Sequence, residues 1–100
     1  MKIDFNIVLR DMDGEILVAE NGKEATLKGA AINALLGVFQ DESTLSGEDK
    51  LKRWEIAVKV KESDLTTEFT IEELVVIKKM IGKAYAPIIV GQAWKLLECN

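Results

Sequence analysis

Apolar and polar positions alternate along the first part of the chain. Apolar side chains occupy every second position there, at Ile3, Phe5, Ile7 and Leu9. This alternation is typical of a β-strand with one buried face. A second apolar run, EILVA at 15–19, fits a returning strand, and DMDG between the two runs supplies Asp and Gly for a turn. The pattern therefore predicts a β-hairpin over residues 1–24.

From residue 26 the apolar positions recur with the period of a helix. They fall at Leu27, Ala30, Ala31, Ala34 and Leu35, followed by Val38 or Phe39. These spacings place the side chains on one helix face. Thr26 stands directly before the pattern, where its hydroxyl can cap the first turn. We predict a helix over residues 26–39.

A polar segment, QDESTLSG at 40–47, predicts a loop before the second helix. Ser46 followed by Asp49 is related to the capping box that opens many helices. We predict that this helix covers residues 47–62. Its inward face is expected at Leu51, Trp54 and Ala57 or Val58, with Lys61 following on the same face.

The third predicted helix opens with a capping box, Thr70-x-x-Glu73, and covers residues 70–86. Its apolar stripe is expected at Leu74, Ile77, Ile81, Ala84 and Tyr85. Pro87 lacks a backbone donor, so it ends this helix but suits the first turn of another. PIIVGQAWKLLE therefore predicts a fourth helix over residues 87–98.

Together these elements predict an α+β fold in one domain, residues 1–100. An N-terminal β-hairpin precedes three to four helices packed as a small bundle. A hairpin of two strands is marginal on its own, so it has to lie on the helices, gain a third strand or pair with another subunit. The segment DLTTEF at 64–69 is the candidate third strand, and we find no internal repeat.

Composition narrows the expected setting. Of the 100 residues, 48% are hydrophobic and 30% are charged, which is typical of a globular domain. No apolar run approaches the roughly 20 residues needed to span a bilayer, and the start of the chain lacks a signal-peptide cleavage pattern. The one cysteine, Cys99, has no intramolecular partner, so we expect a reducing, cytoplasmic setting and no membrane association.

Little in the chain points to catalysis. It contains no histidine, which is the commonest general base, and neither a GxSxG elbow nor a glycine-rich phosphate loop. Adjacent acidic residues such as Glu72 and Glu73 fall in a predicted first helical turn, where negative charge complements the helix dipole. We therefore predict a protein that is not an enzyme and has no catalytic residues and no small-molecule substrate.

The stretch DMDGEI also resembles the middle of a calcium-binding EF-hand loop. Aligning Gly14 with the sixth loop position places Asp11 and Asp13 at ligand positions and Glu20 at the last one. The first ligand position then falls on Leu9, which has no side-chain oxygen. The turn of a hairpin explains the same residues, so we favour the turn and predict no metal and no cofactor.

The last predicted helix is the strongest candidate for binding another protein. It is apolar nearly all round, and a helix of this kind either lies in the core or docks on a partner. The pattern leaves both alternatives open. The candidate residues for self-association or partner binding are Tyr85, Ile88, Ile89, Val90, Trp94 and Leu97.

The second predicted helix is a candidate for contact with nucleic acid. Its basic side chains around Trp54 are Lys50, Lys52, Arg53, Lys59 and Lys61. A basic helix can lie against phosphates. The alternative is a solvated helix face, with Trp54 in the core and Glu55 paired with Lys59. The net charge of −4 favours this alternative.

Three stretches together resemble a known group of proteins. They are the DMDGEI turn leading into TLKGAAINALL, then SGEDKLKRWEIAVKV, and finally IKKMIGKAYAPIIVGQAWKLLE. This arrangement resembles small proteins of tailed double-stranded DNA bacteriophages and prophages of Gram-negative bacteria. The resemblance implies a non-enzymatic accessory protein of the host cytoplasm, used in virion assembly, with tail-assembly chaperones as one fitting class. Its expected partners are a second copy of itself or another phage protein, and a nucleic-acid-binding regulator is the alternative.

Overall fold

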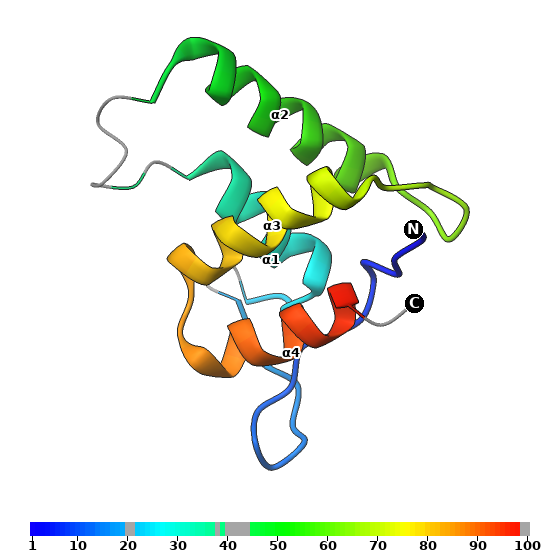
Figure 1. Cartoon of the computed structure of the whole chain (residues 1–100). Helices are drawn as coiled ribbons and strands as arrows, with labels where there is room; N and C mark the ends of the chain where they lie inside the picture. The colour runs from blue at the N-terminus through cyan, green and yellow to red at the C-terminus, as the bar shows by residue number, and fades with distance from the viewer. Residues whose placement is uncertain (20–21, 38, 40–44, 99–100) are drawn as a thin grey trace.

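The computed structural model describes residues 1–19, 22–37, 39 and 45–98, and its regular elements are helices. They are α1 (Leu27–Leu36), α2 (Gly47–Glu62), α3 (Ile71–Ala84) and α4 (Pro87–Glu98). α1 packs against both α2 and α3, and α4 contacts α3. In Figure 1, α2 lies along one edge of the molecule and α4 near the opposite edge, with α1 and α3 between them.

The four helices confirm the helical part of the prediction, with two differences at their ends. The second and fourth helices cover the predicted residues 47–62 and 87–98. The first helix ends at Leu36 and not at residue 39, because Gly37 turns into an extended conformation (φ −74°, ψ 155°). The third is bounded by Thr70 and Tyr85, which both have extended backbone and cap the helix from outside.

The predicted caps open the first three helices. Thr26 Oγ1 accepts a hydrogen bond from Gly29 N at 3.0 Å, and Ser46 Oγ accepts one from Asp49 N at 3.1 Å. At the start of α3 the capping box is complete. Its donor–acceptor distances are 3.0 Å from Glu73 N to Thr70 Oγ1 and 2.8 Å from Thr70 N to Glu73 Oε1. These bonds satisfy helix-end donors that would otherwise lack partners.

The core is one apolar cluster drawn from all four helices and from the N-terminal segment. Its buried members are Ile3, Phe5, Leu27, Ala31, Ala34, Leu35, Ile56, Ala57, Val60, Phe69, Leu74, Ile77, Met80, Ile81, Ala93 and Leu97. The rings of Phe5 and Phe69 meet with centroids 5.1 Å apart. The alternation at the start of the chain therefore identified a buried face correctly, since Ile3, Phe5 and Leu9 are all buried.

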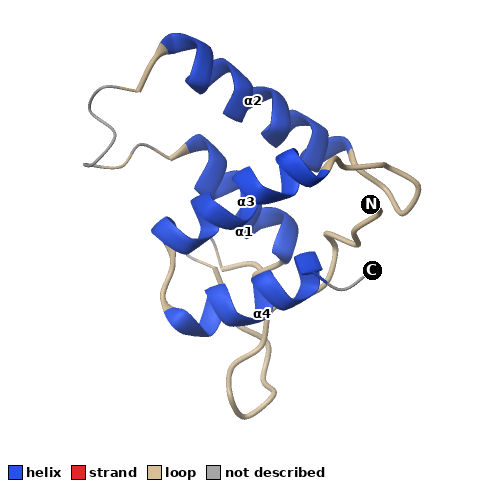
Figure 2. Cartoon of the chain, in the orientation of Figure 1, coloured by secondary structure: helices blue, strands red, loops and turns tan. Residues whose placement is uncertain are grey.

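The predicted β-hairpin is not confirmed. Within the described residues the N-terminal segment forms isolated antiparallel bridges, and no continuous strand is present (Figure 2). The bridges join Val8 to Thr26, Arg10 to Ile16, and Val18 to Glu24. The candidate third strand at 64–69 likewise contributes only one bridge, from Glu68 to Lys2.

The residues that form these bridges recur every eight positions, at Val8, Ile16 and Glu24 and at Arg10, Val18 and Thr26, a spacing that the apolar pattern did not predict. Leu9 N donates to Ala25 O at 2.8 Å, Ala25 N donates to Leu17 O at 2.8 Å, and Leu17 N donates to Leu9 O at 2.9 Å. The hydrogen bonds thus link the backbones of Leu9, Leu17 and Ala25 in a closed ring. Gly14 and Gly22, also eight residues apart, adopt the left-handed conformation in the intervening turns (φ +86° and +81°). The N-terminal segment therefore provides hydrogen-bond partners for its own backbone by winding on itself. A β-hairpin would instead form a longer, continuous ladder of hydrogen bonds between two strands.

No helix in the described part of the chain combines the length and the apolar character needed to cross a membrane.

Candidate interaction surfaces

The predicted binding residues of α4 fall mainly on its inner side. Leu97 is 1% exposed and belongs to the core, so it presents no surface to a partner. Ile89, Val90 and Tyr85 are half-buried and pack against the core. Of the two alternatives for this helix, the core position accounts for most of its apolar side chains.

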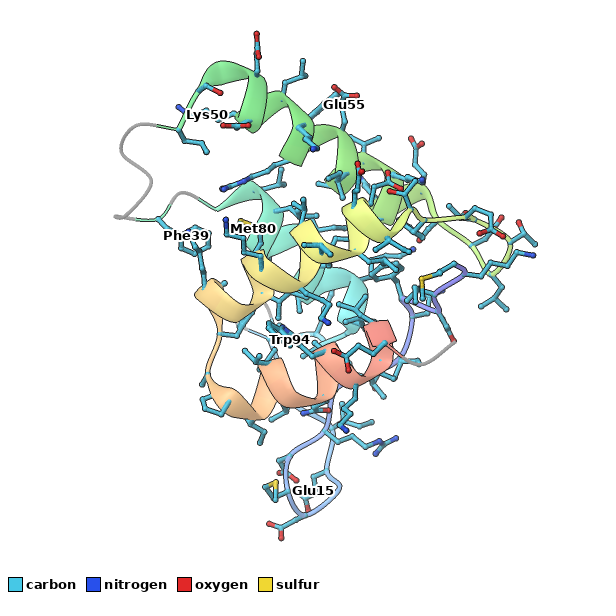
Figure 3. The ribbon with its side chains drawn as sticks, in the orientation of Figure 1. Glu15, Phe39, Lys50, Glu55, Met80 and Trp94 are labelled. Carbon is cyan, nitrogen blue, oxygen red and sulfur yellow. The ribbon has the colours of Figure 1, made fainter. Side chains whose placement is uncertain are left out.

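Trp94 fastens α4 to α3. Its Nε1 donates a hydrogen bond to the carbonyl of Lys78 at 3.0 Å, and the Lys78 ammonium lies 4.8 Å from the centre of the ring. The indole lies against Gly82, where an added Cβ would meet Cζ2 at 3.2 Å. Figure 3 shows Trp94 between the two helices. The side chain is 37% exposed, but its contacts are those of a structural residue.

An ion pair reinforces this junction. Lys78 Nζ lies 2.6 Å from Glu98 Oε1, near the end of α4. The hydrogen bond and charge of Lys78 hold the pKa of Glu98 below its usual value. Beside the junction, the turn from α3 to α4 leaves a shallow apolar depression of about 420 Å³, lined by Gly82, Tyr85, Pro87, Val90 and Gly91. Ile88, next to it in the chain, is 37% exposed.

The basic residues of α2 do not gather on one face. At about 100° per residue, Lys50 and Lys61 lie on one side of the helix, and Lys52 and Lys59 lie on the other. Lys59 is moreover half-buried, with Nζ 2.8 Å from Glu73 Oε1 and 4.9 Å from the centre of the Phe69 ring. The predicted pairing of Lys59 with Glu55 on the same helix is replaced by this link from α2 to α3.

The Lys59–Glu73 pair shifts the titration of the carboxylate. Partial burial acts to raise the pKa of Glu73, but hydrogen bonds from Lys59 and from the Thr70 backbone outweigh it. The pKa of Glu73 therefore lies below its ordinary value. Among the other basic residues, Arg53 is half-buried, whereas Lys50, Lys52 and Lys61 are exposed.

The apolar face predicted for α2 points to solvent, which corrects the expectation that Trp54 lies in the core. Leu51 is 55% exposed and Trp54 is 56% exposed. The buried side of α2 consists of Ile56, Ala57 and Val60, which contribute to the core cluster. Leu51, Trp54 and the half-buried Val58 lie roughly opposite that side. We call these three residues the outer face of α2.

Charged residues border the outer face on both sides. Glu48, Glu55 and Glu62 recur every seven residues along one border, and all are exposed. Lys50 lies along the other border, and Lys61 follows Trp54 by seven residues, so it lies in line with Trp54. Within the described part of the chain, none of these five side chains forms an ion pair. Figure 3 shows Glu55 pointing away from the other helices.

The DMDGEI stretch uses its carboxylate to build a turn. Asp11 Oδ1 accepts hydrogen bonds from Asp13 N at 2.9 Å and from Glu15 N at 3.0 Å. Glu20, the last residue of the calcium-loop alignment, lies outside the described residues. Among the residues that the structure describes, no three acidic or cysteine side chains cluster closely enough to hold a metal ion.

No protein family, no curated protein and no solved structure matches this chain. Two helices expose large apolar side chains at helical spacing. They are α3, with Ile71 (71% exposed) and Val75 (58%), and α2, with Leu51 and Trp54 on its outer face. Only the outer face of α2 presents an aromatic ring among these side chains. The molecule is a small protein of four packed helices with an N-terminal segment wound against them.

Proposed function

We propose that this protein acts by binding other protein chains, without catalysis, and that the outer face of α2 is its docking surface. The observation that carries the proposal is the exposure of Trp54, which is 56% accessible beside Leu51 at 55%. A tryptophan and a leucine one helical turn apart gain free energy when a partner removes them from water. Tryptophan is also among the residues that dominate binding energy at protein interfaces.

The absence of histidine from the sequence supports a role without catalysis, because it removes the commonest general base. The phage setting is supported by the resemblance of the sequence to small proteins of tailed bacteriophages and prophages. In that setting we propose that the protein is an accessory factor of virion assembly, for example in building the tail. Its gene neighbourhood tests this part: flanking genes for tail components support it, whereas flanking integrase and repressor genes contradict it.

Photo-crosslinking in cells that carry the gene for this protein tests the docking surface. A photoreactive amino acid at position 54 should capture a protein partner, because the outer face of α2 is covered in the complex. The matched control places the same amino acid at Glu72, which is exposed in the first turn of α3. An adduct with protein at position 54 but not at 72 is expected. No adduct at position 54 contradicts the docking surface.

Contact with nucleic acid is the second candidate function. The observation in its favour is that an exposed aromatic ring, Trp54, lies on the same side of α2 as the exposed Lys50 and Lys61. Such a ring can stack on an unpaired base while the cations meet phosphates. This function predicts binding that weakens steeply with salt. If no duplex or single strand shifts in a gel at low salt, this candidate is removed.

A further inference from the structure

We propose that the partner of the outer face of α2 is the same face of a second copy of this chain, with the two helices running parallel. This inference rests on the proposed function and makes it specific. It identifies the occupant of the docking surface and the orientation in which that occupant binds.

The apolar positions on this face have the spacing that pairs two helices. Leu51, Trp54 and Val58 follow one another by three and then four residues. This is the a, d, a pattern through which helices pair in coiled coils. Val58 is half-buried and the other two are more than half exposed, so the described part of the chain leaves this seam largely uncovered.

The charges on the two borders determine the orientation. Lys50 precedes the seam residue Leu51 and occupies a g position, whereas Glu55 follows Trp54 and occupies an e position. Lys61, seven residues after Trp54, occupies the next d position and ends the apolar seam. In a parallel pair, g of one helix faces e of the other, so Lys50 meets Glu55 of the second copy. In an antiparallel pair, the e positions of one helix face the e positions of the other. The acidic border formed by Glu48, Glu55 and Glu62 then faces the acidic border of the second copy. The parallel pair also brings the two Lys61 side chains together at the end of the seam, which is one unfavourable contact against two Lys50–Glu55 pairs. The antiparallel pair has only like charges along the acidic border, so the charge pattern favours the parallel pair.

The fold leaves room for this arrangement. The outer face lies roughly opposite the side of α2 that packs on the core, so the two molecular bodies fall on opposite sides of the helix pair. Figure 1 shows α2 along an edge of the molecule, with the other three helices on one side of it. A two-fold axis parallel to α2 then relates the copies and makes the interface isologous.

The expected dimer is weak. α2 has 16 residues, which supply only about two heptads of contact. Two helices of this length bury less than roughly 1,200 Å² in total, which is typical of transient complexes. Association is therefore expected at high protein concentration, or at the local concentration reached inside an assembly.

Sedimentation velocity over a hundredfold concentration range tests the pairing. The full-length protein should move from monomer toward dimer as its concentration rises, and Leu51→Glu should remain monomeric. Trp54→Ala should weaken the dimer at least tenfold. Circular dichroism at low concentration shows whether each variant is folded, which is expected because both side chains are largely exposed. A protein that stays monomeric throughout the range overturns the proposal, and so does a Leu51→Glu variant that still dimerises.

A charge exchange tests the orientation. Lys50→Glu and Glu55→Lys should each weaken the dimer several-fold, because each places like charges opposite one another in a parallel pair. The double variant should recover the original affinity, since it restores opposite charges. Glu15→Lys makes the same charge change as Glu55→Lys on the exposed N-terminal turn and should have no effect. A double variant as weak as the single variants overturns the parallel orientation.

A cysteine cross-link gives an independent test of the register. In a Cys99→Ser background, Leu51→Cys should form a disulfide-linked dimer on mild oxidation, because a parallel pair places position 51 opposite itself. Ile71→Cys is the control, since Ile71 is 71% exposed on α3 and lies outside the seam. A Leu51→Cys protein that cross-links no more than the Ile71→Cys control overturns the parallel register.

The cellular cross-link at position 54 separates this inference from the proposed function. An adduct of twice the chain's mass supports both. An adduct with a different protein, together with a strictly monomeric purified protein, supports the docking surface and overturns the self-pairing. No adduct and no dimer overturns both.

Discussion

The side-chain amide of Gln92 completes both backbone hydrogen bonds of Arg10. Gln92 Oε1 accepts from the Arg10 N–H at 2.9 Å, and Gln92 Nε2 donates to the Arg10 carbonyl at 2.5 Å. The amide thus takes the place of a neighbouring strand. It joins α4 to the N-terminal segment at a point where that segment forms only isolated bridges. Both groups are near solvent, so water competes for these bonds.

We predict that Gln92→Ala lowers the free energy of unfolding by about 1 kcal/mol. The substitution removes both hydrogen bonds to Arg10 and a third from Gln92 Nε2 to the Ile88 carbonyl, but water replaces them in part because the site is exposed. Urea denaturation measures the change. Lys95→Ala, on the same helix and exposed, is the control and should change stability by less than about 0.5 kcal/mol. Equal effects of the two substitutions would mean that the amide contact does not stabilise the fold.

The two tryptophans should respond differently to truncation. Trp94→Ala removes the packing on Gly82 and the bond to Lys78, so we expect a loss of about 2–3 kcal/mol, less than for a fully buried tryptophan. Trp54→Ala should cost less than about 0.5 kcal/mol, because the ring is 56% exposed. Denaturation at low protein concentration, where the chain is monomeric, gives both values. A larger loss for Trp54→Ala would contradict the assignment of the two roles.

Acid should weaken the start of α3. The pKa of Glu73 is lowered in the folded protein from its ordinary value of 4.5, so the ionised carboxylate stabilises the fold at pH values above that ordinary pKa. This contribution is lost as the pH falls through the lower, folded pKa. Glu73→Gln should therefore be less stable than the parent near pH 7, and the difference should shrink below about pH 4. Urea denaturation at both pH values measures the difference in stability between Glu73→Gln and the parent. A difference that grows in acid would contradict a stabilising role of the ionised Glu73.

Substitution by alanine at two glycines should change the stability of the protein in opposite directions. Gly14 has a φ of +86° and open space around it, so Gly14→Ala should cost about 1–2 kcal/mol through backbone strain alone. Gly91 also has open space but lies within α4, so Gly91→Ala should stabilise the protein by about 0.5–1 kcal/mol. Thermal denaturation of the Gly14→Ala and Gly91→Ala variants measures both changes in stability. A stabilising Gly14→Ala would show that the turn does not require the left-handed conformation.

Amide hydrogen exchange should detect the ring of backbone hydrogen bonds in the N-terminal segment. The amides of Leu9, Leu17 and Ala25 donate within the ring, so we expect all three to exchange slowly and with similar protection. Ile16 and Val18 are the internal controls, because among the described residues their amides donate no hydrogen bond and should exchange faster. Protection of Leu17 without protection of Ala25 would indicate a two-segment hairpin in place of the ring.

The starts of the first three helices could be predicted from the sequence because capping is local. Thr26, Ser46 and Thr70 each accept a hydrogen bond from an amide three residues ahead, so a short window of sequence contains both partners. Pro87 likewise marks the start of α4 by its own covalent geometry. The winding of the N-terminal segment escaped prediction. Its bridges each join a single pair of residues, and the residues that form them recur every eight positions along the chain. The alternation of apolar residues resembles a strand whether or not a ladder forms.

Which side of α2 is covered was decided by the tertiary structure alone. The helix carries one apolar set at Ile56, Ala57 and Val60 and another at Leu51, Trp54 and Val58. Periodicity shows that both sets exist, but it contains no information about which one meets α1. The small side chains of α1, such as Ala31 and Ala34, are fully buried and leave room for neighbouring helices to pack closely. The sequence by itself determined where the helices begin, because the partners are close in the chain. The packing of distant helices decided that Trp94 is structural and that Trp54 faces solvent.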